Sequence, residues 1–503
     1  MLKKLRIEAN RTRTENGAAT LLSTGSECLD LFAAIGALRN AAEQEIIVRF
    51  ARAYAEDRDL AMKMLFYSRD IRGGLGERRV FRTILNHLAD TQPESVRKNL
   101  HLVSEYGRWD DLTVLFGTQC ENDAMALIGS QLSKDLAALD AGRNVSLMAK
   151  WLPSVNTSNA ESVRNGKRIA KALKMTDAEY RRTLVKLRAK IRIIENNLRE
   201  KDYTFSYAAQ PSRAMLKYRK AFRRNDEERY AAFLARVEKG GETIHTGALY
   251  PYDIVEKALR FHGDKTERKA LDVTWNALED YAPQGNALCV IDGSGSMFWG
   301  GTPIPATVAL SLGMYFAERC KGEFHNHFIT FSNSPALVEF GGIDLYDKFN
   351  RAREADWGGT TNIEAAFDLL LRTAIKNHVS GQDMPRTLYI FSDMEFNRCV
   401  TSGPASADRW GYYGRTLNRN QINTVIEAQV DKWAAYGYEV PRVIFWNLDA
   451  RQENIPAIGA GFSYVSGFSM NMVECILSGK DGIELMLEKL NSSRYEAITS
   501  IHG

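Results

Sequence analysis

The sequence predicts two kinds of fold in one chain: an all-α N-terminal part, then a part in which helices alternate with strands of a parallel sheet. Up to about residue 280, apolar residues recur at spacings of three and four, which is typical of helices with one buried face. Beyond that point, short β-rich apolar runs alternate with helical stretches, which favours a doubly wound sheet. A chain of 503 residues is also too long for one hydrophobic core. We expect a basic N-terminal arm over 1–27, a helical domain over 28–280 and an α/β domain over 281–503.

The helical part starts with a clear amphipathic pattern. In the stretch 41–57, Ile46, Phe50 and Tyr54 fall on one helical face together with Ile47. Similar stretches follow, separated by short turns, and this succession favours a superhelical stack of the HEAT or armadillo type, although no repeat of fixed period is found. The glycine-rich stretch 73–78 is interpreted as a helix–helix turn, with a phosphate cradle as the alternative.

Basic charge is concentrated in one region. The whole chain has a net charge of +4, but residues 151–250 hold 22 Lys and Arg against 11 Asp and Glu, whereas 281–503 hold 18 against 24. A local excess of this kind is typical of a surface that binds RNA or DNA. A helical surface that is simply well solvated explains the same charge equally well.

Two stretches of the basic region supply candidate RNA contacts. In 177–200, an apolar seam at helical spacing (Leu184, Leu187, Ile191, Ile194 and Leu198) is expected to face the core, with basic rows on both sides. In 211–230, cations are interleaved with Tyr218 and Phe222, which suits single-stranded RNA: charge for phosphates and rings for bases. The alternative is core aromatics with solvated charges outside. The candidate contacts are Arg181, Arg182, Lys186, Arg188, Lys190, Arg192, Arg213, Lys217, Arg219, Lys220, Arg223 and Arg224.

In the α/β part, oxygen-bearing side chains gather where strands are expected to end. The expected strands are 287–292, 327–331, 387–393 and 442–449, and the expected helices are 303–320, 361–378 and 420–437. Asp292, Ser294 and Ser296 follow the first strand, Asp393 ends the third, and a threonine lies in a glycine loop before a helix. Open α/β sheets bind ligands beyond the carboxyl ends of their strands. Two carboxylates and three hydroxyls, without Cys or His, suit Mg²⁺ or Mn²⁺; helix caps and turns explain each motif singly.

This arrangement resembles the metal-ion-dependent adhesion site of von Willebrand factor A domains. The shared features are D-x-S-x-S after the first strand, a threonine in a glycine-rich loop and an aspartate after a later strand. The resemblance assigns Asp292, Ser294, Ser296, Thr361 and Asp393 to the ion, with Thr360 as an alternative to Thr361. It also implies that the ion presents an open coordination position to an acidic group of a partner.

A second resemblance covers most of the chain. It rests on YSRDIRGGLGERRVFRTIL (67–85), EYGRWDDL (105–112), KWLPSVNTSN (150–159), YRRTLVKLRAKIRIIENNL (180–198) and SDMEFN (392–397). These stretches are similar to the domain of unknown function 2828 family, which couples a helical region to an A domain and is akin to the TROVE-domain Ro ribonucleoproteins. The resemblance implies RNA binding by HEAT-like helices, which in Ro proteins form a ring closed by the A domain. It identifies no individual RNA contact and leaves ring closure open.

These observations favour a non-catalytic, RNA-binding ribonucleoprotein component, with a metal-dependent protein-interaction scaffold as the alternative. Enzymatic activity is not expected, because no nucleophile elbow or P-loop is present; Glu395, two residues after Asp393, offers a hydrolytic role as a minor alternative. The six cysteines are scattered, and no apolar stretch could span a membrane or serve as a signal peptide. We therefore expect a cytoplasmic protein without membrane partners.

Overall fold

The computed structural model describes residues 1, 5, 9–191, 193–260, 265–281, 285–299, 302–396, 425–457, 461–472 and 481–501. They divide into two compact units, each assembled from separate stretches of chain. The α/β unit contains Met1–Ala41, Tyr250–Asp264 and Glu279–Lys489, and the helical unit contains Ala42–Leu249, Lys265–Leu278 and Leu490–Gly503. This division differs from the three consecutive segments that we expected. The described residues up to Ala41 belong to the unit of the sheet, and those from Leu490 to Ile501 belong to the helical unit.

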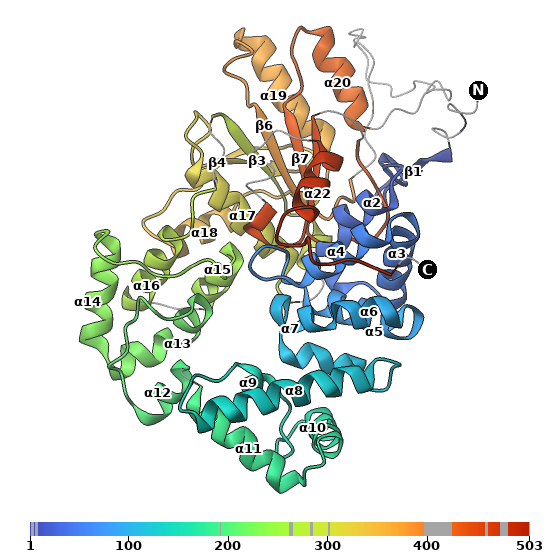
Figure 1. Ribbon diagram of the computed structural model, residues 1–503. Helices are drawn as coiled ribbons and strands as arrows, with labels where there is room; N and C mark the ends of the chain where they lie inside the picture. The colour runs from blue at the N-terminus through green and yellow to red at the C-terminus, as the bar shows by residue number, and fades with distance from the viewer. Residues whose placement is uncertain are drawn as a thin grey trace. The chain divides into compact units, whose positions relative to one another are not determined.

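A six-stranded sheet organises the α/β unit (Figure 1). Its strands are β3 (Ala287–Asp292), β4 (His327–Phe331), β5 (Leu337–Glu339), β6 (Thr387–Ser392), β7 (Arg442–Asn447) and β8 (Phe462–Ser466). They lie in the order β5-β4-β3-β6-β7-β8, and all neighbours are parallel except β4 and β5. The chain order reverses between β3 and β6. Such a reversal opens a ligand-binding crevice beyond the carboxyl ends of the two strands.

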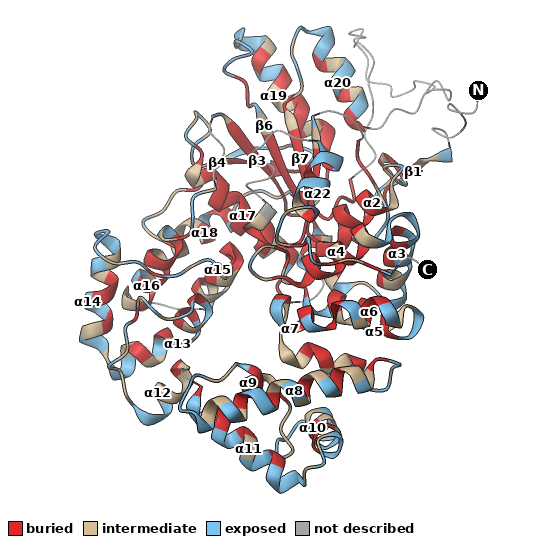
Figure 2. Cartoon of the chain, in the orientation of Figure 1, coloured by how far each residue is buried: buried red, intermediate tan, exposed pale blue. Residues whose placement is uncertain are grey.

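Helices cover both faces of this sheet. The helices of the α/β unit are α2 (Glu27–Ala34), α15 (Pro251–Leu259), α17 (Pro305–Arg319), α18 (Leu345–Arg353), α19 (Ile363–Asn377), α20 (Val425–Ala435) and α22 (Gly482–Leu490). One face packs Val290 and Phe445 against Phe367 of α19 and Trp433 of α20. On the other face, Phe316 of α17 stacks on Tyr389, with ring centroids 4.6 Å apart. The central strands are therefore buried on both sides, as Figure 2 shows, which explains their continuous apolar sequence.

The helical unit consists of helices joined by short turns. They are α3 (Glu43–Glu56), α4 (Arg58–Arg69), α5 (Arg78–Thr91), α6 (Pro93–Asn99), α7 (Val103–Tyr106), α8 (Glu121–Asp140), α9 (Met148–Trp151), α10 (Ala160–Ala172), α11 (Asp177–Lys190), α12 (Ile194–Glu200), α13 (Ser212–Asn225), α14 (Glu227–Glu238) and α16 (Lys265–Asn276). The predicted apolar seam is broken between α11 and α12, yet Ile191 and Ile194 on either side of the break stay buried. None of the helices in the described ranges is long and apolar enough to cross a bilayer.

A buried carboxylate joins α4, α5 and the 3₁₀ turn Trp109–Leu115. Asp111 is fully buried and accepts hydrogen bonds from Nε of Arg69 (2.8 Å), Nε of Arg82 (2.6 Å) and the backbone N of Arg108 (2.9 Å). Burial alone would raise the pKa of Asp111, but the guanidinium groups of Arg69 and Arg82 outweigh it and lower that pKa. Asp111 therefore stays charged and holds these elements together.

The glycine-rich loop between α4 and α5 is a turn, as predicted. Its backbone amides point inward: Gly74 and Gly76 both donate to the carbonyl of Asp70, and Leu75 donates to the carbonyl of Tyr67. A Cβ at Gly74 would lie 2.0 Å from that Tyr67 carbonyl oxygen, so this position requires glycine. Because these amides already have acceptors, the loop offers no phosphate cradle.

The C-terminal residues complete the helical unit. Nη2 of Arg494 donates to Oδ1 of Asp70 (2.7 Å), and the hydroxyl of Tyr495 donates to Oδ2 of the same carboxylate (3.0 Å). Nδ2 of Asn99 donates to the carbonyl of Thr499 (2.7 Å). These contacts join the end of the chain to helices that begin more than 400 residues earlier.

Neutralising Asp111 should destabilise the helical unit selectively. Asp111→Asn leaves Arg69 charged and buried, so we expect a loss of about 3 kcal/mol, typical of a broken buried pair. Hydrogen exchange of the α4 and α5 amides measures this loss locally. Because the folded pKa of Asp111 is lowered, the difference from wild type should be fully present above pH about 4 and shrink as the pH falls below it.

The neighbouring carboxylate provides the control. Asp110 pairs with Arg78, whose side chain is 43% exposed, so Asp110→Asn should cost less than about 1 kcal/mol. Equal effects of the two substitutions would contradict the assignment of Asp111 as the central anchor.

Candidate metal site and basic surface

The first part of the candidate metal site is the turn that follows β3. Asp292 is the last residue of this strand, and its Oδ1 accepts a hydrogen bond from the backbone N of Ser294 (2.8 Å). A Cβ at Gly293 would lie 2.3 Å from the ring of Trp357, so only glycine fits between them. The hydroxyl oxygens of Ser294 and Ser296 lie 3.0 Å apart. Neighbouring ligands of an octahedral magnesium ion, with bonds of about 2.1 Å, have about this separation.

The second part is the end of the adjacent strand β6. The hydroxyl of Ser392 donates to Oδ2 of Asp292 (2.6 Å) and so connects the two strand ends. Asp393 follows, also buried. Burial, and then the negative charge of Asp393, raise the pKa of Asp292. Two buried carboxylates that repel each other favour uptake of a proton or a cation between them.

The glycine loop before α19 supplies the threonine. Gly358 and Gly359 have φ angles of 56° and 62°, a left-handed conformation that favours glycine. The hydroxyl of Thr361 donates to the carbonyl of Glu395 (2.8 Å), next to Asp393, whereas the hydroxyl of Thr360 accepts from the backbone N of Asn333 (3.0 Å). Of the two threonines, Thr361 is therefore linked to the segment after β6.

Two further charged residues at this site were not among the predicted ligands. Nη2 of Arg451 donates to Oδ2 of Asp393 (2.8 Å). Glu395 is fully buried, and its two carboxylate oxygens accept from the backbone N of Glu15 (2.6 Å) and Nδ2 of Asn454 (2.9 Å). Through these two contacts, Glu395 holds neighbouring segments of the chain together. Arg451 and Asn454 belong to no motif and could not be predicted from a single sequence.

The donor set fits a hard divalent cation. Hydrogen bonds connect Asp292, Ser294 and Ser296 to one another and to Ser392, and Asp393 interacts electrostatically with Asp292. Thr361 is joined to this group through Glu395. All the candidate ligands are oxygens, as Mg²⁺ and Mn²⁺ prefer. Within the described ranges, no cluster of three or more His, Cys, Asp or Glu offers an alternative metal site.

In the helical unit, four of the predicted RNA contacts form an exposed row on α11, which we call the α11 basic row: Arg181, Arg182, Lys186 and Lys190. No ion pair engages these four side chains within the described part of the chain. Val185, between them, is 55% exposed. The row is thus a cationic surface that is open to solvent.

Other predicted contacts have structural roles. Arg188 points inward and donates to the carbonyls of Ala149 (2.7 Å) and Leu152 (2.9 Å), because its position on α11 faces α9. Arg219 is buried in an ion pair with Glu267 (2.9 Å). Phe222 is fully buried in the core formed by α13, α14 and α16, so it cannot stack on a base. These three side chains are therefore engaged within the helical unit.

The remaining candidates lie on or near the surface of α13. Nε of Arg213 donates to the carbonyl of Ala248 (2.9 Å), and Nζ of Lys217 lies 4.7 Å from the ring centre of Tyr218. Lys220 is exposed, with Nζ 3.9 Å from the Glu267 carboxylate. Arg224 is exposed and Arg223 half-buried, and Arg192 lies outside the described residues.

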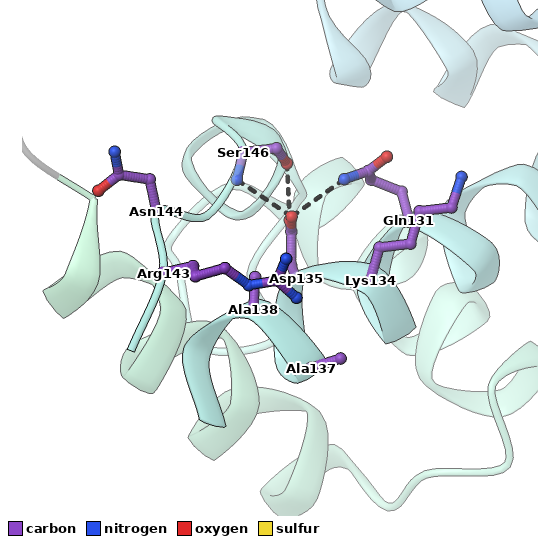
Figure 3. Close-up of a pocket in the computed structure, with 8 residues that line it drawn as sticks. All are labelled: Gln131, Lys134, Asp135, Ala137, Ala138, Arg143, Asn144 and Ser146. Carbon is purple, nitrogen blue, oxygen red and sulfur yellow. Dashed lines mark hydrogen bonds between the residues drawn. The ribbon is translucent and has the colours of Figure 1, made fainter. Parts of the chain in front are cut away.

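A hollow of about 500 Å³ lies at the end of α8 (Figure 3). Lys134 and Arg143 line it, together with the buried carboxylate of Asp135. That carboxylate accepts hydrogen bonds from Nε2 of Gln131 (3.0 Å) and from the backbone N (3.0 Å) and hydroxyl (2.6 Å) of Ser146. Asp135 therefore fixes the loop after α8, and no ligand is needed to satisfy it.

Residues 14–126 and 114–282 match the family described as Domain of unknown function (DUF2828), and residues 286–498 match Domain of unknown function (DUF7788). A protein of Acanthamoeba polyphaga mimivirus, itself uncharacterized, is 28% identical over 513 residues, covering 94% of this chain and 86% of the relative.

Among solved structures, the crystal structure of Deinococcus radiodurans RO (RSR) protein shows 11% identity over 95% of each chain, with a TM-score of 0.32. A score at that level carries no argument about fold or function. The first family match, in contrast, spans more than half of the 503 residues. The chain therefore belongs to the family described as Domain of unknown function (DUF2828).

Proposed function

We propose that this protein is a non-catalytic RNA-binding protein whose helical unit contacts RNA through the α11 basic row. The observation that carries the proposal is the exposure of Arg181, Arg182, Lys186 and Lys190 on one helix, without ion pairs among the described residues. Such a row attracts the phosphates of a polyanion and releases their counterions. The resemblance to Ro ribonucleoproteins suggests RNA as the polyanion.

We further propose that the α/β unit is a von Willebrand factor A-type domain that holds Mg²⁺ or Mn²⁺. Asp292, Ser294, Ser296, Thr361 and Asp393 would supply the ligands. The raised pKa of Asp292 supports this proposal, because a divalent cation offsets the repulsion between the two buried carboxylates. A bound cation would offer a coordination position that an acidic side chain of a partner can occupy.

One observation favours the scaffold as a second candidate function. Phe298 and Trp299, just beyond Ser296, are 53% and 78% exposed. Exposed aromatic side chains beside an ion site are suited to a protein interface. A protein partner with an acidic residue would then bind at the cation, whether or not the helical unit binds RNA.

Removing one carboxylate should abolish cation binding. Calorimetric titration with Mn²⁺ should detect one site in the wild-type protein, and Asp292→Ala should weaken binding more than about tenfold, as expected for loss of a coordinating group. Asp383→Ala, at an exposed position of the same unit, is the matched control and should leave the affinity unchanged. Absence of Mn²⁺ and Mg²⁺ uptake by the wild-type protein would refute the metal site.

Charge reversal on α11 should weaken RNA binding. The triple variant Arg182→Glu, Lys186→Glu, Lys190→Glu should lower the affinity for single-stranded RNA in filter binding and flatten its salt dependence by about 0.7 in log–log slope per lost phosphate contact. The control reverses three exposed cations elsewhere in the unit, Lys134, Arg143 and Lys239, and so has the same net charge.

The outcome also separates the two candidate functions. Equal losses in the two triple variants would mean that only net charge matters, which contradicts the assignment to α11. If the wild-type protein binds no RNA at micromolar concentration, yet retains protein partners only without EDTA, the scaffold is the correct function.

A further inference from the structure

The N-terminal residues form a hairpin that packs at the candidate metal site. Its strands, β1 (Arg11–Arg13) and β2 (Ala19–Leu21), are antiparallel. Leu21 and Ile455 exchange two backbone hydrogen bonds (3.1 and 2.8 Å), which attach β2 to the segment after β7. The hairpin is therefore fixed to the same end of the sheet as the predicted ligands.

The turn of this hairpin, Thr14 to Gly17, contacts the segment after β6. The backbone N of Glu15 donates to the Glu395 carboxylate (2.6 Å), and Nδ2 of Asn16 donates to the Glu395 carbonyl (2.7 Å). The same Nδ2 lies 3.5 Å from the hydroxyl of Thr361, and the hydroxyl of Thr14 donates to the carbonyl of Phe396. The turn thus touches one predicted metal ligand directly and lies beside a second.

An arginine connects the turn to that second ligand. Nη1 of Arg451 lies 2.9 Å from a carboxylate oxygen of Glu15, and its Nη2 lies 2.8 Å from Oδ2 of Asp393. The guanidinium is therefore shared between a hairpin carboxylate, half exposed, and a site carboxylate that is almost fully buried. A fork of fixed geometry allows both contacts at once.

We propose that Glu15 and Arg451 couple docking of the hairpin to cation binding at Asp393. The inference rests on the proposed metal site. Arg451 and a divalent cation are both positive and both require the Asp393 carboxylate, so they compete. Glu15 weakens this competition, because its carboxylate still binds the Arg451 guanidinium when the Asp393 carboxylate binds the cation.

The effects of the hairpin and the cation on each other must be equal in size and direction. If the docked hairpin raises the affinity for the cation, the cation must favour the docked hairpin by the same factor. The hairpin turn and the cation should therefore stabilise each other. Glu15 and Arg451 are positioning residues in this scheme, since neither needs to touch the ion.

A double-mutant cycle tests the coupling in the full-length protein, with Mn²⁺ as the calorimetric probe. Glu15→Gln should weaken Mn²⁺ binding about threefold, the ordinary contribution of a part-exposed ion pair. Arg451→Met removes the competing charge and should strengthen binding about tenfold. In the Arg451→Met background, Glu15→Gln should have little further effect, because its partner is absent.

Two matched variants control for charge and packing. Glu323→Gln removes an exposed carboxylate elsewhere in the α/β unit and should leave the affinity unchanged. Arg451→Lys keeps the positive charge that competes with the cation, so the affinity should not rise as it does in Arg451→Met.

Hydrogen exchange of the wild-type protein gives a second readout that needs no variant. Addition of Mn²⁺ should slow exchange at the amides of Glu15, Ala18 and Leu21, which donate to Glu395, Phe396 and Ile455. The amides of α14, in the other unit, serve as the internal reference.

Each outcome decides the proposal. Mn²⁺ binding that Glu15→Gln leaves unchanged, or exchange that Mn²⁺ leaves unchanged, overturns the coupling but keeps the metal site. A Glu15→Gln effect of full size in the Arg451→Met background shows direct attraction between Glu15 and the ion, and overturns the role of Arg451. If the wild-type protein takes up no Mn²⁺, the coupling and the metal site both fail.

Discussion

Asp292 and Asp393 lie buried at the ends of adjacent strands, and each buried carboxylate needs partners for its charge. A carboxylate removed from water needs donors or positive charge nearby. Asp292 receives a backbone amide and the hydroxyl of Ser392, while Asp393 receives the guanidinium of Arg451. The glycine beside Asp292, the loop of Trp357 and the segment after β6 all adopt conformations that keep these groups in place.

The buried carboxylates Asp111 and Asp292 differ in the kind of partner that compensates their charge. In the helical unit, Asp111 is surrounded by the guanidinium groups of Arg69 and Arg82, and Glu267 is paired with Arg219. In the α/β unit, the partners of Asp292 in the structure are neutral donors. A fully compensated carboxylate is suited to holding helices together, whereas an undercompensated one retains attraction for a cation. This contrast distinguishes the structural carboxylate Asp111 from the candidate metal ligand Asp292.

Much of the α/β part could be predicted because its strands are buried on both faces. The expected strands at 287–292 and 327–331 coincide with β3 and β4. The short edge strand β5 and strand β8 were missed, since neither stands out as a long apolar run. The contributions of Glu15 and Arg451 could not be predicted either, because they depend on contacts between residues hundreds of positions apart.

In the helical part, periodicity identified buried faces but could not show how individual cations are used. Arg181 and Arg188 are seven positions apart on α11, so they lie on nearly the same face. Nevertheless Arg181 is exposed, and Arg188 donates to the carbonyls that end α9. Arg188 is turned inward because the neighbouring helix ends in carbonyl groups that lack a donor partner within that helix. Such carbonyls cannot be located from a single sequence.

The return of the C-terminal residues to the helical unit has a consequence for biosynthesis. Asp70 leaves the ribosome more than 400 residues before its partners Arg494 and Tyr495 do. Likewise, the hairpin around Glu15 must wait for strands that are translated much later. The helical unit therefore cannot finish folding before the α/β unit has been synthesised. During synthesis, incompletely folded segments of this chain therefore expose apolar surface that can aggregate.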